Sequence, residues 1–418
     1  MNVRYDIKCK VCNYVFITKV QLGYVEKANI RLGCPKCKSL IKGTIYQNAP
    51  DYSVSFENAE YGHVSAEANA EIFSLSTELP ILKQTANAKN NFGFSLSPFI
   101  ALTGIIPLNI FRDRYLEFRN YREKYLMSLE TLIELTHNKK WDYVFSEAKN
   151  NFFPELSNNL IKNKELSFHL VSQIIRGFIN KAIPTNYEHS YTIRFLYKAT
   201  LTNIQKDKVV LDRLDTELNT YINVDREFVI ALKICLNFII NLESYLPVIG
   251  LSYGKGFDAV FNDEFLITTF SFEELRDIYK DSFELLARAS IVYIGFSNYL
   301  RNNDPNNFSD ISSLSNLTEF YNMNNGNKKD IISKVPLLQK YFRSLLDSQI
   351  RNSIGHNKTE YYIVEQLIKY YPYTDLKKKD IFKEKSLVDF AYLTYLMNLC
   401  VTDLVSFIGK WNYRMGVN

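Results

Sequence analysis

Four cysteines near the N-terminus constrain the fold more than any other feature of the 418-residue chain. Cys9-Lys-Val-Cys12 and Cys34-Pro-Lys-Cys37 form two CxxC pairs separated by 21 residues. Zinc takes four soft ligands in a tetrahedron, and each CxxC turn supplies two thiolates close together. The residues between the pairs are rich in β-branched and aromatic side chains, as a small hairpin requires. The pattern therefore predicts a zinc ribbon with these four cysteines as ligands.

The predicted zinc is structural. Four cysteines close the coordination shell and leave no open position, so we expect no catalytic metal. A redox pair is the alternative, but a thioredoxin-like motif uses a single CxxC within a βαβ unit. The remaining cysteines, Cys235 and Cys400, lie on apolar helical faces and are expected to be core thiols.

Basic residues are concentrated in the same N-terminal segment. Residues 1–48 contain nine basic side chains against Asp6 and Glu26, a net charge of +7, so the rest of the chain carries −2 of the total +5. Such local asymmetry is typical of proteins that contact nucleic acid. Docking of another protein and a purely structural role remain alternatives for the ribbon. The nine are Arg4, Lys8, Lys10, Lys19, Lys27, Arg31, Lys36, Lys38 and Lys42.

Helical periodicity dominates from about residue 109. Glycine (15) and proline (11) are scarce, which also favours long helices, so the predicted fold class is mainly α. We divide the chain into a zinc ribbon (1–48), a β or irregular connector (49–108), a helical middle region (109–222) and a helical C-terminal domain (223–418). The predicted helices are Ile110–Leu135, Trp141–Asn150, Glu155–Lys181, Tyr187–Thr220, Arg226–Tyr245, Phe272–Arg301, Val335–Ile354 and Ser386–Trp411.

The apolar stretch Phe92–Phe111 is long enough to span a bilayer. Its prolines and glycines would leave backbone groups unsatisfied in lipid, so we expect a buried irregular segment instead. The opening residues, MNVRYDIKCKVCNY, contain no apolar signal region. We therefore expect a cytoplasmic protein with no membrane partner.

The C-terminal domain contains the residues best suited to catalysis, in the run Arg351-Asn352-Ser353-Ile354-Gly355-His356. Imidazole titrates near neutral pH, so His356 can accept or donate a proton. Arg351 is permanently charged and offers a planar fork of donors to phosphate oxygens. The alternative is structural, with His356 ending a helix and Arg351 in a surface ion pair. Common nucleotide-binding and hydrolase motifs, such as GxxxxGK[ST], GxGxxG, HExxH and GxSxG, are absent.

Geometry limits how these two residues can act together. Five residues on an unbroken helix separate Arg351 from His356 by roughly 140° around its axis. Either Gly355 ends the helix and turns His356 back, or two protomers each contribute one motif to a shared site.

The run from Arg351 to His356 resembles the R-x(4–6)-H motif of HEPN-domain ribonucleases, in which a polar residue, often Asn, follows the Arg as Asn352 does here. The resemblance covers about residues 223–418 and implies a HEPN-like helical bundle that forms a homodimer with both motifs in one cleft. It implies a metal-independent endoribonuclease that cleaves RNA by attack of the 2′-OH, with Arg351, Asn352 and His356 as site residues. It also implies a toxin or abortive-infection antiphage effector, whose further partners would be a phage trigger or an antitoxin.

Two other functions remain open. The chain could be a non-catalytic scaffold whose zinc ribbon binds nucleic acid or protein and whose helical domain dimerises. Nucleotide binding by the helical domain is a weaker alternative.

Overall fold

The computed structural model divides the chain into two compact units, each assembled from three separate segments. The first unit combines Met1–Leu116, Ile240–Asp277 and Asn352–Tyr395. The second combines Glu117–Ile239, Ile278–Arg351 and Leu396–Asn418. The residues that the structure describes are 2–21, 23–48, 51–62, 72–82, 105–183, 208–252, 265–335, 338–339, 342, 345–372 and 381–417.

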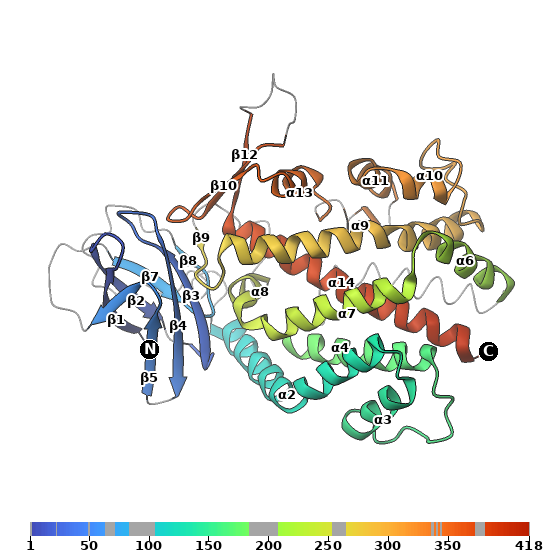
Figure 1. Ribbon diagram of the computed structural model, residues 1–418, viewed down its shortest axis with the longest axis horizontal. Helices are drawn as coiled ribbons and strands as arrows, with labels where there is room; N and C mark the ends of the chain where they lie inside the picture. Colours follow the sequence, from blue (N-terminus) through green and yellow to red (C-terminus); the bar gives the residue numbers. More distant parts are fainter. Residues whose placement is uncertain are drawn as a thin grey trace. The chain divides into compact units, whose positions relative to one another are not determined.

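Two sheets at the N-terminus share one apolar core within the first unit (Figure 1). The first has the order β6-β1-β2-β7, and its β2–β7 pair is parallel. The second has the order β3-β4-β5 and is antiparallel. Alternation explains the shared core, because every second side chain of a strand points to the same face. The strands are β1 (Asn2–Cys9), β2 (Val15–Gln21), β3 (Lys27–Gly33), β4 (Leu40–Asn48), β5 (Asp51–Phe56), β6 (Ala59–Gly62) and β7 (Ile72–Ser76).

Strand pairing does not stop at residue 48, where the predicted ribbon ends. β5 continues the sheet of β3 and β4, while β6 and β7 flank the pair of β1 and β2. Further along, β8 (Ile81–Leu82) pairs with β9 (Phe265–Leu266). The amide of Arg31 donates to the carbonyl of Thr268 over 2.6 Å, so the segment after β9 provides an acceptor for one backbone donor at the free edge of β3.

A third sheet lies where the sequence predicted only helices. It has the order β10-β11-β12, with strands Thr359–Tyr362, Leu367–Tyr370 and Lys383–Ser386. The side chain of Gln366 fixes this sheet within the first unit, because it accepts from the amide of Ile267 (2.9 Å) and donates to its carbonyl (2.5 Å). The expectation of an all-helical C-terminal domain is therefore wrong in this segment.

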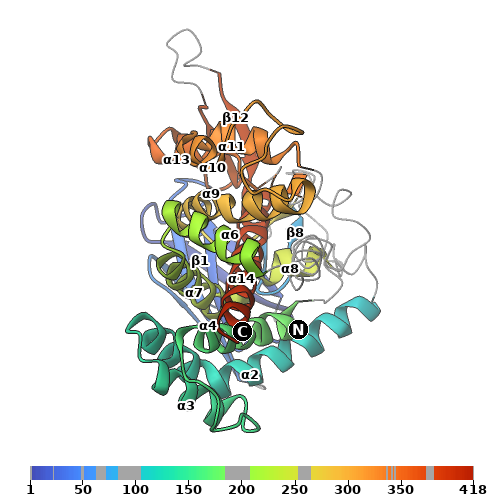
Figure 2. The same cartoon turned by 90° about the vertical axis from the view of Figure 1, so that its right-hand side faces the viewer.

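Helices make up most of the described chain, so the prediction of a mainly helical protein with small sheets is confirmed. In the second unit α14 packs on three helices, through Phe296 of α9, Thr402 with Cys235 of α7, and Tyr413 with His169 of α4 (Figure 2). The helices are α2 (Ile105–His137), α3 (Trp141–Asn151), α4 (Lys164–Ala182), α6 (Lys208–Tyr221), α7 (Val224–Ile240), η1 (Leu242–Tyr245), α8 (Leu246–Ser252), α9 (Phe272–Asn302), α10 (Leu317–Asn322), α11 (Asn325–Ile332), α13 (Ser348–Gly355) and α14 (Leu387–Val417).

The helix predicted over Val335–Ile354 is not formed as one element. α13 begins only at Ser348, because the carboxylate of Asp347 accepts from the amides of Gln349 (2.9 Å) and Ile350 (3.4 Å) and so caps a new helix. Most of the predicted helix Tyr187–Thr220 and of the apolar stretch Phe92–Phe111 lies outside the described residues.

One described helix is long and apolar enough to cross a membrane. Within Leu387–Tyr413 of α14, an 18-residue window has a mean hydropathy of 1.4, but 89% of that window is buried inside the protein. A core helix has the same two properties, and its packing against α4, α7 and α9 accounts for the apolar surface here.

Candidate metal centre and Arg–His site

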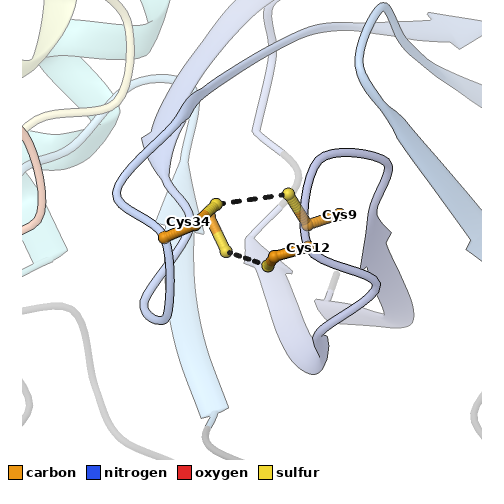
Figure 3. A group of neighbouring side chains, drawn as sticks. Cys9, Cys12 and Cys34 are labelled. Carbon is orange, nitrogen blue, oxygen red and sulfur yellow. Dashed lines mark hydrogen bonds between the residues drawn. The ribbon is translucent and has the colours of Figure 1, made fainter.

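The first CxxC pair forms a tight turn at the end of β1. The amide of Cys9 donates to the carbonyl of Tyr14 (2.9 Å), and the amide of Asn13 donates back to the carbonyl of Cys9 (2.8 Å). Asn13 has a φ of 57°, in the left-handed region that Asn tolerates better than most residues. This turn places both sulfur atoms of the pair on the same side of the backbone (Figure 3).

The second pair repeats the same turn between β3 and β4. The amide of Cys34 donates to the carbonyl of Ser39 (2.9 Å), and the amide of Lys38 donates to the carbonyl of Cys34 (2.8 Å). Lys38 has a φ of 60° and occupies the position that Asn13 holds in the first turn. Two turns with the same hydrogen bonds therefore present two matching pairs of thiols.

The four sulfur atoms converge as the sequence predicted. Cys9 Sγ lies 3.7 Å from Cys37 Sγ, and Cys12 Sγ lies 3.6 Å from Cys34 Sγ. All four lie within 4.8 Å of one another. A tetrahedral zinc with Zn–S bonds of about 2.3 Å requires S–S separations of about 3.8 Å. The cysteine cluster, meaning Cys9, Cys12, Cys34 and Cys37, therefore has the dimensions and donor atoms of a tetrahedral thiolate site.

Electrostatics within the cysteine cluster favour a bound cation. Burial raises the pKa of the Cys34 thiol to about 12. Hydrogen bonds from the side chain and backbone of Ser39 lower the pKa of Cys37 to about 6. Burial opposes ionisation of Cys9, but hydrogen bonds from Ser39 and from the amides of Cys12 and Val11 outweigh it and lower its pKa. Hydrogen-bond donors thus already face part of the cluster, while full ionisation of all four sulfurs requires a positive charge among them.

The Arg–His element, meaning Arg351, Asn352 and His356, lies on and just after α13. The amide of His356 donates to the carbonyl of Asn352 (3.0 Å), so helical bonding continues through His356. The chain turns at the next residue, because Asn357 has a φ of 53°. The amides of Asn357 and Lys358 then donate to the carbonyls of Ile354 (3.2 Å) and Ser353 (2.7 Å), which is a Schellman motif.

This helix end excludes one of the two arrangements left open by the sequence, the return of His356 at Gly355. The turn falls at Asn357 and not at Gly355, so it does not fold His356 back toward Arg351. The separation of roughly 140° around the helix axis therefore persists. Asn352 and His356 are both exposed, and His356 occupies the C-cap, where the helix dipole favours a positive charge.

Arg351 has a carboxylate partner in the second unit. Its Nε donates to Glu284 Oε1 over 2.7 Å, and its Nη2 contacts the same oxygen. Each of the two side chains is 30% exposed. Glu284 lies 67 residues away on α9, and no spacing or motif in the sequence connects it with Arg351. The pair fixes the orientation of one edge of the guanidinium group.

No protein-family model, curated protein or solved structure matches the chain. Its function is therefore inferred from the chemistry of the cysteine cluster and of the Arg–His element.

Proposed function

We propose that the chain is a metal-independent endoribonuclease of the HEPN type, stabilised by a structural zinc at the cysteine cluster. The observation that supports the catalytic part is the Arg–His element itself. It combines an arginine oriented by Glu284 with an exposed histidine at the end of the same short helix. These are the two groups that RNA cleavage without a metal requires.

RNA carries its own nucleophile, the ribose 2′-OH. His356 would remove the proton from that hydroxyl, and the oxygen would attack the adjacent phosphorus. Arg351 would stabilise the charge that develops on the phosphate oxygens, and Asn352 would orient the phosphate. The bond to the 5′-oxygen breaks, the departing oxygen takes a proton from protonated His356 or from water, and the products are a cyclic phosphate and a 5′-hydroxyl. DNA lacks the 2′-OH, so the activity would be selective for RNA.

A second copy of the chain completes this site. Arg351 and His356 diverge around α13, so one chain does not direct both at the same phosphate. A homodimer in which the arginine of one chain works with the histidine of the other removes this difficulty. The dimerising C-terminal region would then be the HEPN-like bundle that the motif implies.

Zinc is the metal that best fits the cysteine cluster. Four thiolates at these separations match its preferred ligands and geometry and leave no open coordination position. When bound, the metal would hold the two turns together and supply the positive charge that the ionised thiols need.

The biological role follows from the proposed class. A cytoplasmic toxin or abortive-infection effector would cut host or phage RNA after a trigger, and an antitoxin would restrain it otherwise. The residues outside the Arg–His element would recognise the trigger or the substrate.

RNA cleavage in the presence of EDTA tests the proposal. The wild-type protein should cut RNA, while Arg351→Ala and His356→Ala should each lose at least about 100-fold in rate. His137→Ala, which removes another exposed histidine, should cut like the wild type. Equal cutting by His356→Ala would contradict the mechanism.

Mixing the two inactive variants tests the composite site. Arg351→Ala and His356→Ala chains should regain part of the activity when they are combined and allowed to exchange subunits. A mixture that forms mixed dimers and stays inactive would contradict the shared site, as would a fully active monomer.

One observation favours the alternative of a non-catalytic scaffold. The ion pair between Arg351 and Glu284 is also what a purely structural arginine would form. A wild-type protein that retards RNA on a gel without cutting it, and whose binding weakens steeply with salt, would support this alternative.

A further inference from the structure

The structure separates the basic residues of the N-terminal segment into two groups. Arg31 pairs with Glu274 (2.8 Å), Lys38 with Glu365 (3.6 Å) and Lys8 with Glu60 (3.7 Å), so these three serve contacts within the protein. Other basic residues of this segment are exposed and form no ion pair with any described residue. Three of these are Lys10, Lys27 and Lys42.

Two of these lysines lie on one face of the sheet β3-β4-β5. Lys27 is opposite Tyr46 and Arg31 is opposite Lys42, and alternation turns all four away from the core. Between Asp51, which begins β5, and Glu57, which follows it, the other residues of this outer face are uncharged and polar. The outer face consists of Lys27, Asn29, Arg31, Lys42, Thr44, Tyr46, Ser53 and Ser55.

The third lysine continues this surface at the first cysteine turn. The amide of Lys10 donates to the backbone carbonyl of Asn58 (3.1 Å), and the side-chain oxygen of Asn58 accepts from the amide of Lys42 (3.3 Å). Asn58 therefore holds the two lysine backbones next to each other. The backbone positions of the three lysines thus follow one line from Lys10 through Lys42 toward Lys27.

Tyr46 provides an aromatic ring at the far end of that line. It is 43% exposed, and the ammonium group of Lys27 lies 5.6 Å from its ring centre. Lys42 and Tyr46 are four residues apart on β4, or about 13 Å at roughly 3.3 Å per residue. No acidic residue occurs from Lys27 to Asn48. Glu57 follows β5 and its amide donates to the carbonyl of Lys42 (3.0 Å), and Glu274 pairs with Arg31, so these two acids lie at the Lys42 end of this face. Asp51 begins β5 opposite Asn48, at the other end.

We propose that this face binds single-stranded RNA, with Lys10, Lys27 and Lys42 on phosphates and Tyr46 stacked on a base. Cations spaced along a strand beside an exposed ring are the elements by which sheet surfaces hold single strands. A duplex hides the faces of its bases, so the ring has no role in duplex binding. The choice of RNA depends on the proposed ribonuclease function, for which this face would hold the substrate.

Fluorescence anisotropy with a short labelled RNA that cannot pair with itself tests the proposal. The full chain is used with His356→Ala, so that the probe is not cut. Adding Lys10→Ala, Lys27→Ala and Lys42→Ala should weaken binding about tenfold or more and lower the salt slope by about 2. The matched control removes three exposed lysines of the second unit, Lys124, Lys140 and Lys162, and should bind like its parent.

The ring is tested separately. Tyr46→Ala should weaken binding about tenfold, while Tyr46→Phe should retain it, because stacking needs the ring and not the hydroxyl. The same RNA annealed to its complement should bind more weakly than the single strand.

Three results would overturn the proposal. They are unchanged binding by the lysine variant, equal weakening by its control, and duplex binding as tight as single-strand binding. The cleavage assay is independent of all three, so a protein that binds RNA on this face without cutting it would contradict only the proposed nuclease function.

Discussion

The cysteine cluster and the Arg–His element are both short sequence motifs, but they become different kinds of site. Two tight turns bring four cysteines within 4.8 Å, so one chain completes the metal centre. The Arg–His element is closer together in sequence, yet helix geometry directs its members to different sides. Closeness in sequence therefore predicts a site where turns connect the residues, whereas on a helix it does so at spacings of three or four residues and not at the five of Arg351 and His356.

The two sites also differ in how their charge is balanced. The thiols face hydrogen-bond donors but have no cation of their own, so metal binding completes their electrostatics. Arg351 already has a carboxylate, Glu284, contributed by a residue far away in the chain. A substrate phosphate would join that ion pair, whereas a metal would fill the cysteine cluster.

Removal of a metal ligand should have the largest effect. Cys34 is fully buried, and Cys34→Ser should abolish stoichiometric zinc and cost folding free energy on the order of 10 kcal/mol. Elemental analysis and thermal unfolding measure the two effects. Cys235→Ser, which changes another buried cysteine, should keep its zinc, and a Cys34→Ser protein with full zinc would contradict the site.

A buried carboxylate, Glu78, should make the stability of the protein depend on pH. Burial raises the pKa of Glu78 from 4.5 to about 7, although its Oε1 accepts from the amides of Tyr24 and Val25. The folded state therefore favours protonated Glu78, and the resulting stability is full below pH 4.5 and is lost as the pH rises through 7. Glu78→Gln keeps the acceptor oxygen without the charge. It should match the wild type near pH 4 and exceed it by up to about 3 kcal/mol at pH 8, measured by chemical denaturation.

An equal pH dependence of the two proteins would contradict this prediction. Wild-type and Glu78→Gln curves that stay parallel across this range would show that folding does not change the pKa of Glu78.

Gly33 lies beside the cysteine cluster and packs closely against the turn that joins β10 to β11. A Cβ at Gly33 would lie 2.8 Å from Ile363 Cγ2 and 3.0 Å from Val364 Cγ2. Gly33→Ala should therefore destabilise the protein by about 1–3 kcal/mol without loss of zinc. Gly62→Ala is the control, because nothing lies within 4 Å of its Cβ position. Ile363→Ala should reduce the cost of Gly33→Ala in a double-mutant cycle, and strict additivity would rule out the contact.

The smallest expected effect concerns the positioning of Arg351. Glu284→Gln weakens the ion pair that orients the guanidinium group and should lower kcat about tenfold, or about 1.4 kcal/mol, with KM little changed. The pH profile of cleavage should not move, because the substitution leaves the proposed proton-transfer residue, His356, in place. Asp277→Asn, an exposed substitution on the same helix, should leave kcat unchanged. Faster cleavage by Glu284→Gln would contradict the prediction and show that Glu284 competes with the substrate for Arg351.

Local signals explain what the sequence predicted correctly. Ser271 and Glu274 form the capping box at the start of α9, and the predicted helix Phe272–Arg301 matches Phe272–Asn302. The spacing of the two CxxC pairs likewise predicted correctly that the four sulfur atoms come together. In both cases the residues that determine the structure are close in sequence, within one helical turn for α9 and within two successive hairpins, β1–β2 and β3–β4, for the cysteines. The residues between the two CxxC pairs do not form the expected single hairpin, because β2 and β3 belong to different sheets.

The features that the sequence did not predict depend on partners that are distant in the chain. The strands β10, β11 and β12 have four residues each, too few for alternation to stand out beside a helical motif. They are fixed by Gln366, whose partner Ile267 is 99 residues away. Glu284 was missed for the same reason, since an ion pair across 67 residues leaves no periodic pattern.

Because the first unit is assembled from three separate segments, its parts emerge from the ribosome at different times and become available for folding in that order. At about 5–20 residues per second, a ribosome needs roughly 10–40 s to proceed from β8 to its partner β9. For that time the edge of β3 also lacks Thr268, which later accepts its hydrogen bond. The cysteine cluster is complete by Cys37, so metal capture can be the first committed folding step of the nascent chain, long before Tyr395 finishes the unit.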